Sequence, residues 1–266
     1  MRWAGVPGPV SAFYRVLIAA AVLIPWRLAR GETRPSTRRA GWIAAAGGVF
    51  FALDLAMWNT AVLHTQAAIA SILGNNTPVF VGIMSWLVLR KRPRSAFWIG
   101  FALSLAGCAL IMSVNLRSDS ATPGSLFGDV LALAASVFFA AYLITTEHVR
   151  ETMDTLTFNT LAIVGSLAAL LVICLALGLP LTGYPPRAWA ALLGLGLISQ
   201  LGAYYALVYA LGHLPATVTS VGLLAQVPST AVLAWILLGE PLTLSQLAGG
   251  LIVLTGIFIV TRGPRT

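Results

Sequence analysis

Long apolar runs separated by short polar gaps occupy this chain from end to end. Nine runs can be read between charged residues, Pro and Gly. Each run is long enough to cross a bilayer as an α-helix. Their approximate limits are 10–27, 41–63, 67–89, 96–114, 126–146, 156–178, 188–211, 216–238 and 244–261. The pattern predicts an all-α integral membrane protein whose loops are too short to fold as a soluble domain.

Composition supports this fold class and excludes several functions. Only 9% of the 266 residues are charged and 58% are hydrophobic, whereas soluble domains carry about 25% charged residues. The net charge of +8 lies in the gaps between apolar runs, so membrane topology explains it and no nucleic-acid partner is indicated. Cys108 and Cys174 lie inside apolar runs, which indicates neither a disulfide framework nor a metal site.

The distribution of Lys and Arg predicts the orientation. If the gaps alternate between the two sides, one side carries 12 basic residues and the other carries 4. The first group is Arg27, Arg30, Arg34, Arg38, Arg39, Arg90, Lys91, Arg92, Arg94, Arg150, Arg262 and Arg265; the second is Arg2, Arg15, Arg117 and Arg187. The side rich in Lys and Arg is the cytoplasm, so we expect the C-terminus to be cytoplasmic.

The chain also repeats itself after a shift of 149 residues. The matched pairs are Ala61 with Ala210, His64 with His213, Ser71 with Ser220, Trp86 with Trp235, Gly100 with Gly249, and Gly107 with Gly256. We therefore divide the chain into a first repeat over 1–116 and a second over 126–262. An odd number of spans, five, separates equivalent positions, so the second repeat crosses the membrane in the opposite sense.

The inversion explains one contrast between the repeats. Residues 90–92 read RKR in the first copy, whereas the equivalent residues 239–241 read GEP. Because the first loop is expected to be cytoplasmic and the second external, only the first favours basic residues. Inverted repeats of this kind are typical of secondary transporters.

The two repeats differ in length. The first has four spans and the second has five, so nine of an expected ten are visible. The missing partner of 126–146 would precede Met1, and we expect the sequence to lack this first helix. The alternative is a true nine-span protein with an external N-terminus.

Several stretches resemble one transporter family. They are PVSAFYRVLIAA at 9–20, AAIASILGNNTPVFVGIMSWLVL at 67–89, GDVLALAASVFFAAYLI at 128–144, and ATVTSVGLLAQVPSTAVLAWILLGEPLTLSQLAGGLIVLTGIFIV at 216–260. They resemble EamA-type members of the drug/metabolite transporter superfamily, which have ten helices in two five-helix repeats. The resemblance implies movement of small metabolites such as amino acids, sugars or drugs across the membrane, and no ATP site. It also implies that the absent first helix would line a central cavity.

Polar residues within the spans are the candidates for substrate contact, because each is costly in hydrocarbon. Asp54 lies near the middle of span 41–63, and Trp58 follows on the same face. A carboxylate beside an indole suits a cationic or amine-bearing substrate, or a coupling proton. The alternative is a buried Asp that is hydrogen-bonded to a neighbouring helix.

The repeat-related spans 67–89 and 216–238 carry stripes of small and polar residues. We expect the amides of Asn75, Asn76 and Gln226 to face a shared cavity at mid-depth, whereas the Ser and Gly positions favour helix packing. Pro78 and Pro228 interrupt helix hydrogen bonding and are hinge candidates, although prolines are also ordinary in membrane helices.

Span 188–211 contributes Gln200 and Tyr204, which share a face and lie deep enough to line a cavity. Arg15 stands at the outer start of its span, where it can snorkel to the interface or pair with Asp129 or Glu240. Gln200 and Tyr204 complete the predicted substrate pathway.

We therefore predict a secondary carrier of amino-acid-like or amphipathic drug-like solutes that works by alternating access. We expect export, a bacterial inner-membrane location, no cofactor or metal, and a monomer or homodimer. Coupling to a proton or a counter-substrate is left open. The alternatives are a channel-like protein or a non-transporting regulatory protein of the same fold. The sequence contains no phosphate-binding loop and no H-E-x-x-H motif, so an ATP-driven pump and an enzyme are disfavoured.

Overall fold

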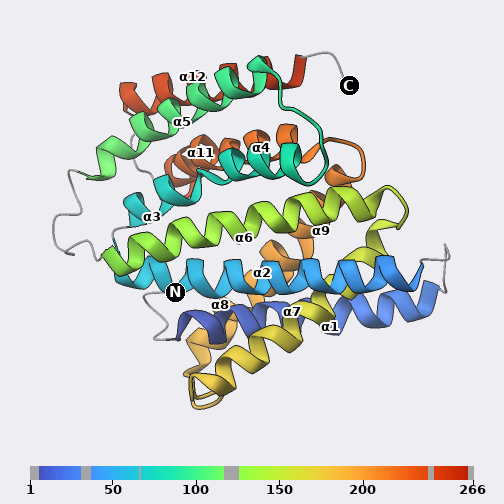
Figure 1. The fold of residues 1–266 in the computed structure, drawn as a ribbon. Coiled ribbons are helices and arrows are strands. Elements are labelled where there is room, and N and C mark those ends of the chain that lie inside the picture. Colours follow the sequence, from blue (N-terminus) through green and yellow to red (C-terminus); the bar gives the residue numbers. More distant parts are fainter. Residues whose placement is uncertain (1–5, 31–36, 66, 117–125, 239–242, 263–266) are drawn as a thin grey trace.

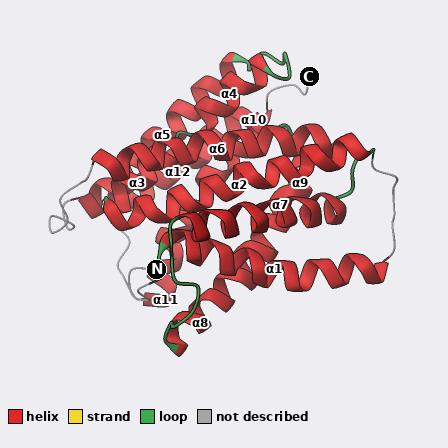
Figure 2. Ribbon diagram, turned by 60° about the horizontal axis from the view of Figure 1, so that its bottom comes forward, coloured by secondary structure: helices red, strands yellow, loops and turns green. Residues whose placement is uncertain are grey.

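The computed structural model describes residues 6–30, 37–65, 67–116, 126–238 and 243–262. Within these ranges the chain forms helices and connecting loops, with no strand (Figure 2). The helices are α1 (Gly8–Arg30), α2 (Arg38–His64), α3 (Ala67–Gly74), α4 (Thr77–Leu87), α5 (Ser95–Leu116), α6 (Leu126–Arg150), α7 (Thr155–Ala176), α8 (Pro186–Gly194), η1 (Leu195–Ala203), α9 (Tyr204–Leu211), α10 (Ala216–Gly222), η2 (Leu223–Ala225), α11 (Gln226–Leu238) and α12 (Leu244–Arg262).

Eight helical segments of the described chain are long and apolar enough to span a membrane. They correspond to the nine predicted runs except for 67–89, which is divided into the short helices α3 and α4. The predicted helical membrane bundle is therefore confirmed, and the difference concerns continuity: one span is broken at its centre.

Polar residues at the helix ends satisfy backbone groups that have no partner within the helix. Thr37 accepts a hydrogen bond from the backbone N–H of Ala40 at the start of α2. Thr243 and Gln246 cap each other's backbone N–H groups at the start of α12, in the reciprocal arrangement of a capping box. These caps set where the spans begin.

Helices α5 and α12, which are equivalent in the two repeats, pack closely along one edge of the bundle (Figure 1). Gly100 lies against the carbonyl of Gly256, and Gly107 lies against the carbonyl of Gly249. Each of these contacts is the repeat equivalent of the other. Ser104 donates a hydrogen bond to the carbonyl oxygen of Val253 at 3.3 Å, 149 residues away. A position therefore meets its own equivalent midway between the two glycine contacts.

This pattern locates a pseudo-two-fold axis. Reciprocal contacts of this type define a two-fold relation, and the order of the glycine pairs makes α5 and α12 antiparallel. An axis that relates antiparallel spanning helices lies in the plane of the membrane, so the repeats are inverted. The second pair of equivalent helices, α1 and α7, also pack together, at the opposite edge in Figure 1.

Helix α6 packs against the first repeat. Its Leu131 and Ala132 lie among Trp58, Ala61 and Ala70 of α2 and α3. The equivalent positions of the second repeat, Leu207, Ala210 and Thr219, line an open apolar groove of about 330 Å³. The two repeats therefore differ within the described chain. The surface of α2 and α3 is covered by α6, whereas the equivalent surface of α9 and α10 borders an open groove.

The contact between α5 and α12 makes a testable claim about stability. A methyl group on Gly256 would overlap the Gly100 carbonyl and the Ser104 hydroxyl, whereas one on Gly250 would find its nearest neighbour, Pro228, at 3.5 Å. We expect Gly256→Ala to reduce stability by about 1–3 kcal/mol through overpacking, measured as a lower melting temperature in detergent. Gly250→Ala is the matched control, and equal melting of the two variants would contradict the packing.

Candidate functional site

Three of the spans depart from regular α-helix near their centres. Span 67–89 stops at Gly74 and restarts at Thr77. Span 188–211 contains the π-helix Leu195–Ala203, and span 216–238 contains the 3₁₀ turn Leu223–Ala225. Irregular backbone inside a membrane is tolerated where protein or a cavity covers it, so these segments mark the interior of the bundle.

Proline explains two of the interruptions. Pro78 cannot donate to the Gly74 carbonyl, and the Thr77 hydroxyl donates to that oxygen instead, at 2.9 Å. Pro228 likewise leaves the Leu224 carbonyl without its usual donor, and the Cys108 thiol approaches that oxygen at 3.9 Å. Side chains thus replace the helix hydrogen bonds that the prolines remove, and this keeps both breaks compatible with hydrocarbon surroundings.

The interrupted segments surround one cavity of about 400 Å³. Its lining comes from α1, α2, the α3–α4 break, α6, η1, α9 and the α10–α11 segment, so both repeats contribute. Asp54 and Ala203 are repeat equivalents, as are Trp58 and Leu207, and all four line the cavity. The cavity therefore lies between the repeats, where the pseudo-two-fold axis brings equivalent helices together. Its volume is typical of small-molecule sites.

A basic and an acidic side chain, those of Arg15 and Asp54, face this cavity. Arg15 of α1 is 7% exposed and donates a hydrogen bond to the Ser199 hydroxyl at 3.2 Å, while its Nε atom has no partner. Asp54 of α2 is 8% exposed. Among the described residues the two form no ion pair within 4 Å, although they are close enough to interact electrostatically. The cavity is thus bordered by one basic and one acidic side chain that do not contact each other.

The predicted amides have different roles. The Gln226 side chain donates to the Asn75 side-chain oxygen at 3.4 Å, a long and weak contact that joins the broken helices of the two repeats across the cavity. The Asn75 amide nitrogen is buried without a partner. Asn76 instead donates to the carbonyls of Ile72 and Leu73, and so caps the end of α3. Asn76 does not line the cavity.

Some of the remaining predicted residues line the cavity and others lie outside its lining. Trp58, Tyr204 and Pro78 line the cavity. The Trp58 ring packs against Gly74 at the break, where a larger residue would displace it. Gln200 is 3% exposed and lies outside the lining, with an unpartnered side-chain oxygen, and Pro228 also lies outside it.

Sequence reasoning missed Arg15 as a cavity residue. It expected this side chain to snorkel or to pair with Asp129 or Glu240. Asp129 instead accepts a hydrogen bond from Thr65 at 2.6 Å, and Glu240 lies outside the described residues. Ser136 and Ser199 also line the cavity. The position of Arg15 inside an apolar run, at 10–27, was the one signal available for it.

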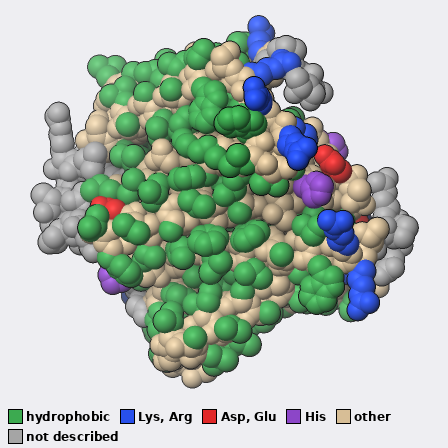
Figure 3. All heavy atoms as spheres, viewed as in Figure 1, with side chains coloured by type: hydrophobic (Ala, Val, Ile, Leu, Met, Phe, Trp, Pro, Cys, Tyr) green, Lys and Arg blue, Asp and Glu red, His purple; other side chains and the backbone are tan. Residues whose placement is uncertain are grey.

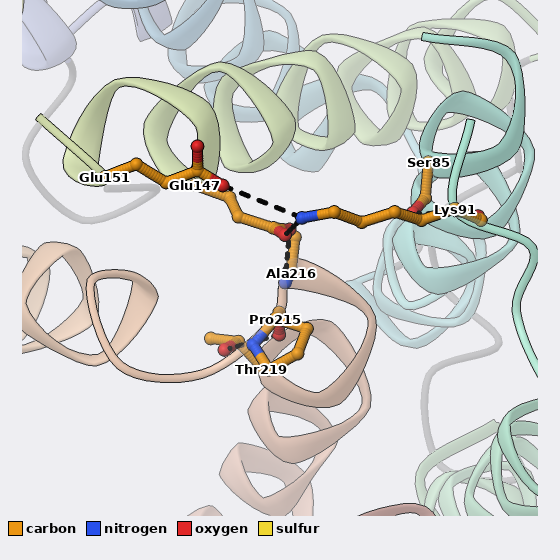
Figure 4. A network of polar contacts seen from close by, with 7 residues as sticks. All are labelled: Ser85, Lys91, Glu147, Glu151, Pro215, Ala216 and Thr219. Carbon is orange, nitrogen blue, oxygen red and sulfur yellow. Dashed lines mark hydrogen bonds and ion pairs between the residues drawn. The ribbon is translucent and has the colours of Figure 1, made fainter. Parts of the chain in front are cut away.

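A buried carboxylate joins three segments at one end of the bundle (Figure 4). One Glu147 oxygen binds the Lys91 ammonium at 3.0 Å, and the other accepts the backbone N–H of Ala216 at 2.8 Å. The more exposed Glu151 lies 3.7 Å from Lys91. The hydrogen bond to Glu147 raises the pKa of Lys91 above its ordinary value. We call Lys91, Glu147 and the Ala216 N–H the end clamp.

The end clamp holds a strained turn. Arg90, which precedes Lys91, has φ of 56°, the left-handed region that costs a non-glycine residue about 1 kcal/mol or more. The equivalent residue of the second repeat is Gly239. Lys and Arg side chains gather along the right edge of the face in Figure 3, which is the end of the helices that carries the clamp in the view of Figure 1. The clamp therefore lies at the basic end of the bundle and links α6 to both repeats' broken helices.

Both halves of the chain match one known protein family. The model of the EamA-like transporter family matches residues 3–113 and again 126–262. The chain belongs to the EamA-like transporter family. The first match covers α1 to α5 and the second covers α6 to α12, so the gap between the two matches falls between α5 and α6.

Named relatives of this EamA-like transporter agree with the family. The uncharacterized transporter YwfM of Bacillus subtilis is 30% identical over 77% of this chain and 68% of its own length. An uncharacterized transporter of Archaeoglobus fulgidus is 30% identical over 94% of this chain and 86% of its own. The pseudopaline exporter CntI of Pseudomonas aeruginosa is 26% identical over 97% of this chain and 88% of its own.

A solved crystal structure shares the fold. It superposes with a TM-score of 0.77 over 97% of this chain and 90% of that chain, at 18% sequence identity. Together with the apolar helices, these comparisons show that the chain is a multi-pass membrane protein of a transporter family.

Proposed function

We propose that this EamA-like transporter is a secondary carrier that exports small amino-acid-like or amphipathic metabolites by alternating access. The observation that carries the proposal is the cavity that broken helices of both inverted repeats enclose. In secondary transporters, substrates bind near the midplane at discontinuous helices between such repeats. The helix breaks beside Pro78 and Pro228 are the proposed hinges.

The end clamp supports a conformation that is closed at one end. It ties the loop after α4 of the first repeat, through α6, to the start of α10 in the second repeat. A rocking motion of one repeat against the other must break a contact that bridges them. We propose that the clamp closes the cavity toward the cytoplasm, because it lies at the end rich in Lys and Arg.

The setting and direction follow from the same features. The basic residues favour a cytoplasmic C-terminus, and the bacterial inner membrane is the proposed location. Export is favoured by the relative that is named as a pseudopaline exporter. Transport rather than catalysis is favoured because the relatives are named transporters. A proton or a counter-substrate is the proposed coupling partner, and the protein is proposed to act as a monomer or homodimer.

Asp54 tests the carrier directly. Among the described residues, Asp54 is the one acidic side chain of the cavity lining, and Asp54→Asn removes its charge without changing its size. We expect transport in proteoliposomes to be abolished or uncoupled, while membrane insertion is retained. Wild type is expected to saturate with rising solute and to show counterflow, whereas a channel would do neither. Normal transport by the variant at several pH values would remove Asp54 from the mechanism.

Glu147 tests the closure at the basic end. In a background with Cys108→Ser and Cys174→Ser, Ser220→Cys places a thiol in the cavity lining. Adding Glu147→Gln removes the charge that holds Lys91. We expect a membrane-impermeant thiol reagent, applied from the cytoplasmic side, to react about 5- to 30-fold faster, which corresponds to one or two kcal/mol of lost closure.

Glu151→Gln is the matched control for this measurement. Glu151 is a neighbouring acid on the same side of Lys91, but it is exposed and its contact is longer. Exposed ion pairs contribute little, so the control should react at the parent rate. Equal rates for the parent, Glu147→Gln and Glu151→Gln would show that the clamp does not close this path.

A further inference from the structure

Arg15 is a buried cation with incomplete pairing. Its side chain has one described hydrogen-bond partner, the neutral Ser199 hydroxyl, and its Nε atom is buried without any. A charge taken out of water needs an opposite charge or several hydrogen bonds to be tolerated. A guanidinium also presents its donors in a planar fork that matches a carboxylate. Arg15 therefore borders the cavity as an anion-binding group that no carboxylate of the described residues contacts within 4 Å.

Asp54 is the complementary group. Its carboxylate has no hydrogen-bond or ion-pair partner among the described residues, and it borders the same cavity. Neither charge is repeated in the other half of the molecule, since the equivalents of Arg15 and Asp54 are Val164 and Ala203. The symmetric scaffold therefore carries one unsymmetrical pair of charges. Such a pair gives a bound molecule a defined orientation.

The rest of the lining favours a small molecule with an apolar portion. Leu55, Leu207 and Leu223 border the cavity, and so does the Phe139 ring. The side chains of Asn75 and Gln226 add neutral polar groups to the lining. A cavity of about 400 Å³ leaves room for a molecule the size of an amino acid, with its charges at the two polar groups and its side chain against the apolar wall.

We infer that Arg15 and Asp54 form a zwitterion site, in which Arg15 binds the carboxylate of an α-amino acid and Asp54 binds its ammonium group. The inference rests on the proposed carrier function and narrows its substrate class from amino-acid-like or amphipathic metabolites to zwitterionic α-amino acids. Both unpaired charges are then neutralised by one ligand. A site with this chemistry rejects molecules that lack either charge, because the group left behind stays buried and unpaired.

Binding to purified protein in detergent tests the inference without depending on transport. Each of the twenty proteinogenic amino acids is added at neutral pH, and the melting temperature is recorded, since a ligand that binds the folded state raises it. For each stabilising amino acid, the dissociation constant is compared with those of its methyl ester and its N-acetyl derivative. We expect both derivatives to bind at least about tenfold more weakly, the effect of losing a hydrogen-bonded charge.

Variants assign the two charges to the two residues. Arg15→Gln should weaken binding of the amino acid about tenfold or more and change binding of its methyl ester by less than about threefold. Asp54→Asn should likewise weaken binding of the amino acid about tenfold or more, and it should change binding of the N-acetyl derivative by less than about threefold. Arg15→Lys should restore part of the affinity. Arg27→Gln, on the same helix but outside the cavity lining, is the matched control and should bind like wild type.

Each outcome decides between the alternatives. The inference is overturned if no amino acid stabilises wild type, if the derivatives bind as tightly as the parent compound, or if Arg15→Gln weakens amino acid and ester alike. The last result would show that Arg15 acts only in packing. If wild type then shows saturable counterflow of another solute, the proposed carrier function stands and the zwitterion site is rejected. Charge-selective binding by a protein that shows no counterflow would keep the site and remove the carrier.

Discussion

The structure depends on the requirement that every backbone polar group inside a membrane find a partner within the protein. Continuous helices meet this requirement alone, whereas interrupted ones need help from side chains. Here the Thr77 hydroxyl donates to the carbonyl that Pro78 leaves without a backbone donor. The Cys108 thiol does the same for the carbonyl that Pro228 leaves without one. Such breaks are tolerable only in the interior, so the three irregular spans collect around one cavity. The same constraint that shapes the fold therefore positions the candidate site.

Inversion turns this cavity into a shared one. Helices α5 and α12 can approach closely because glycines lie at both of their backbone contacts. Between these contacts, the Ser104 hydroxyl donates a hydrogen bond to the Val253 carbonyl. The axis through this contact brings equivalent faces of the two repeats together, so that a broken helix of one repeat faces a broken helix of the other. In the alternating access proposed above, this scaffold would adopt two related arrangements, each open at one end. The end clamp and its strained turn at Arg90 distinguish those ends.

Much of the architecture could be predicted because it follows from long-range patterns. Hydropathy located the spans, and the spacing of matched residues revealed the inverted repeat. Side-chain roles were harder to predict. Asp54 could be identified because an acid at mid-span demands an interior position, and it does line the cavity. Asn76 had the same amide as Asn75 but caps a helix that sequence reasoning treated as continuous. Arg15 was missed because an arginine near a span's end reads as interfacial.

Labelling of two loops from opposite sides of the membrane tests the inverted arrangement most directly. In the cysteine-free background, Arg92→Cys marks the turn after α4, and Thr243→Cys marks the equivalent turn before α12. An impermeant thiol reagent should reach the first thiol only from the cytoplasm and the second only from outside. Labelling of both from the same side would contradict the opposed repeats and, with them, the shared cavity.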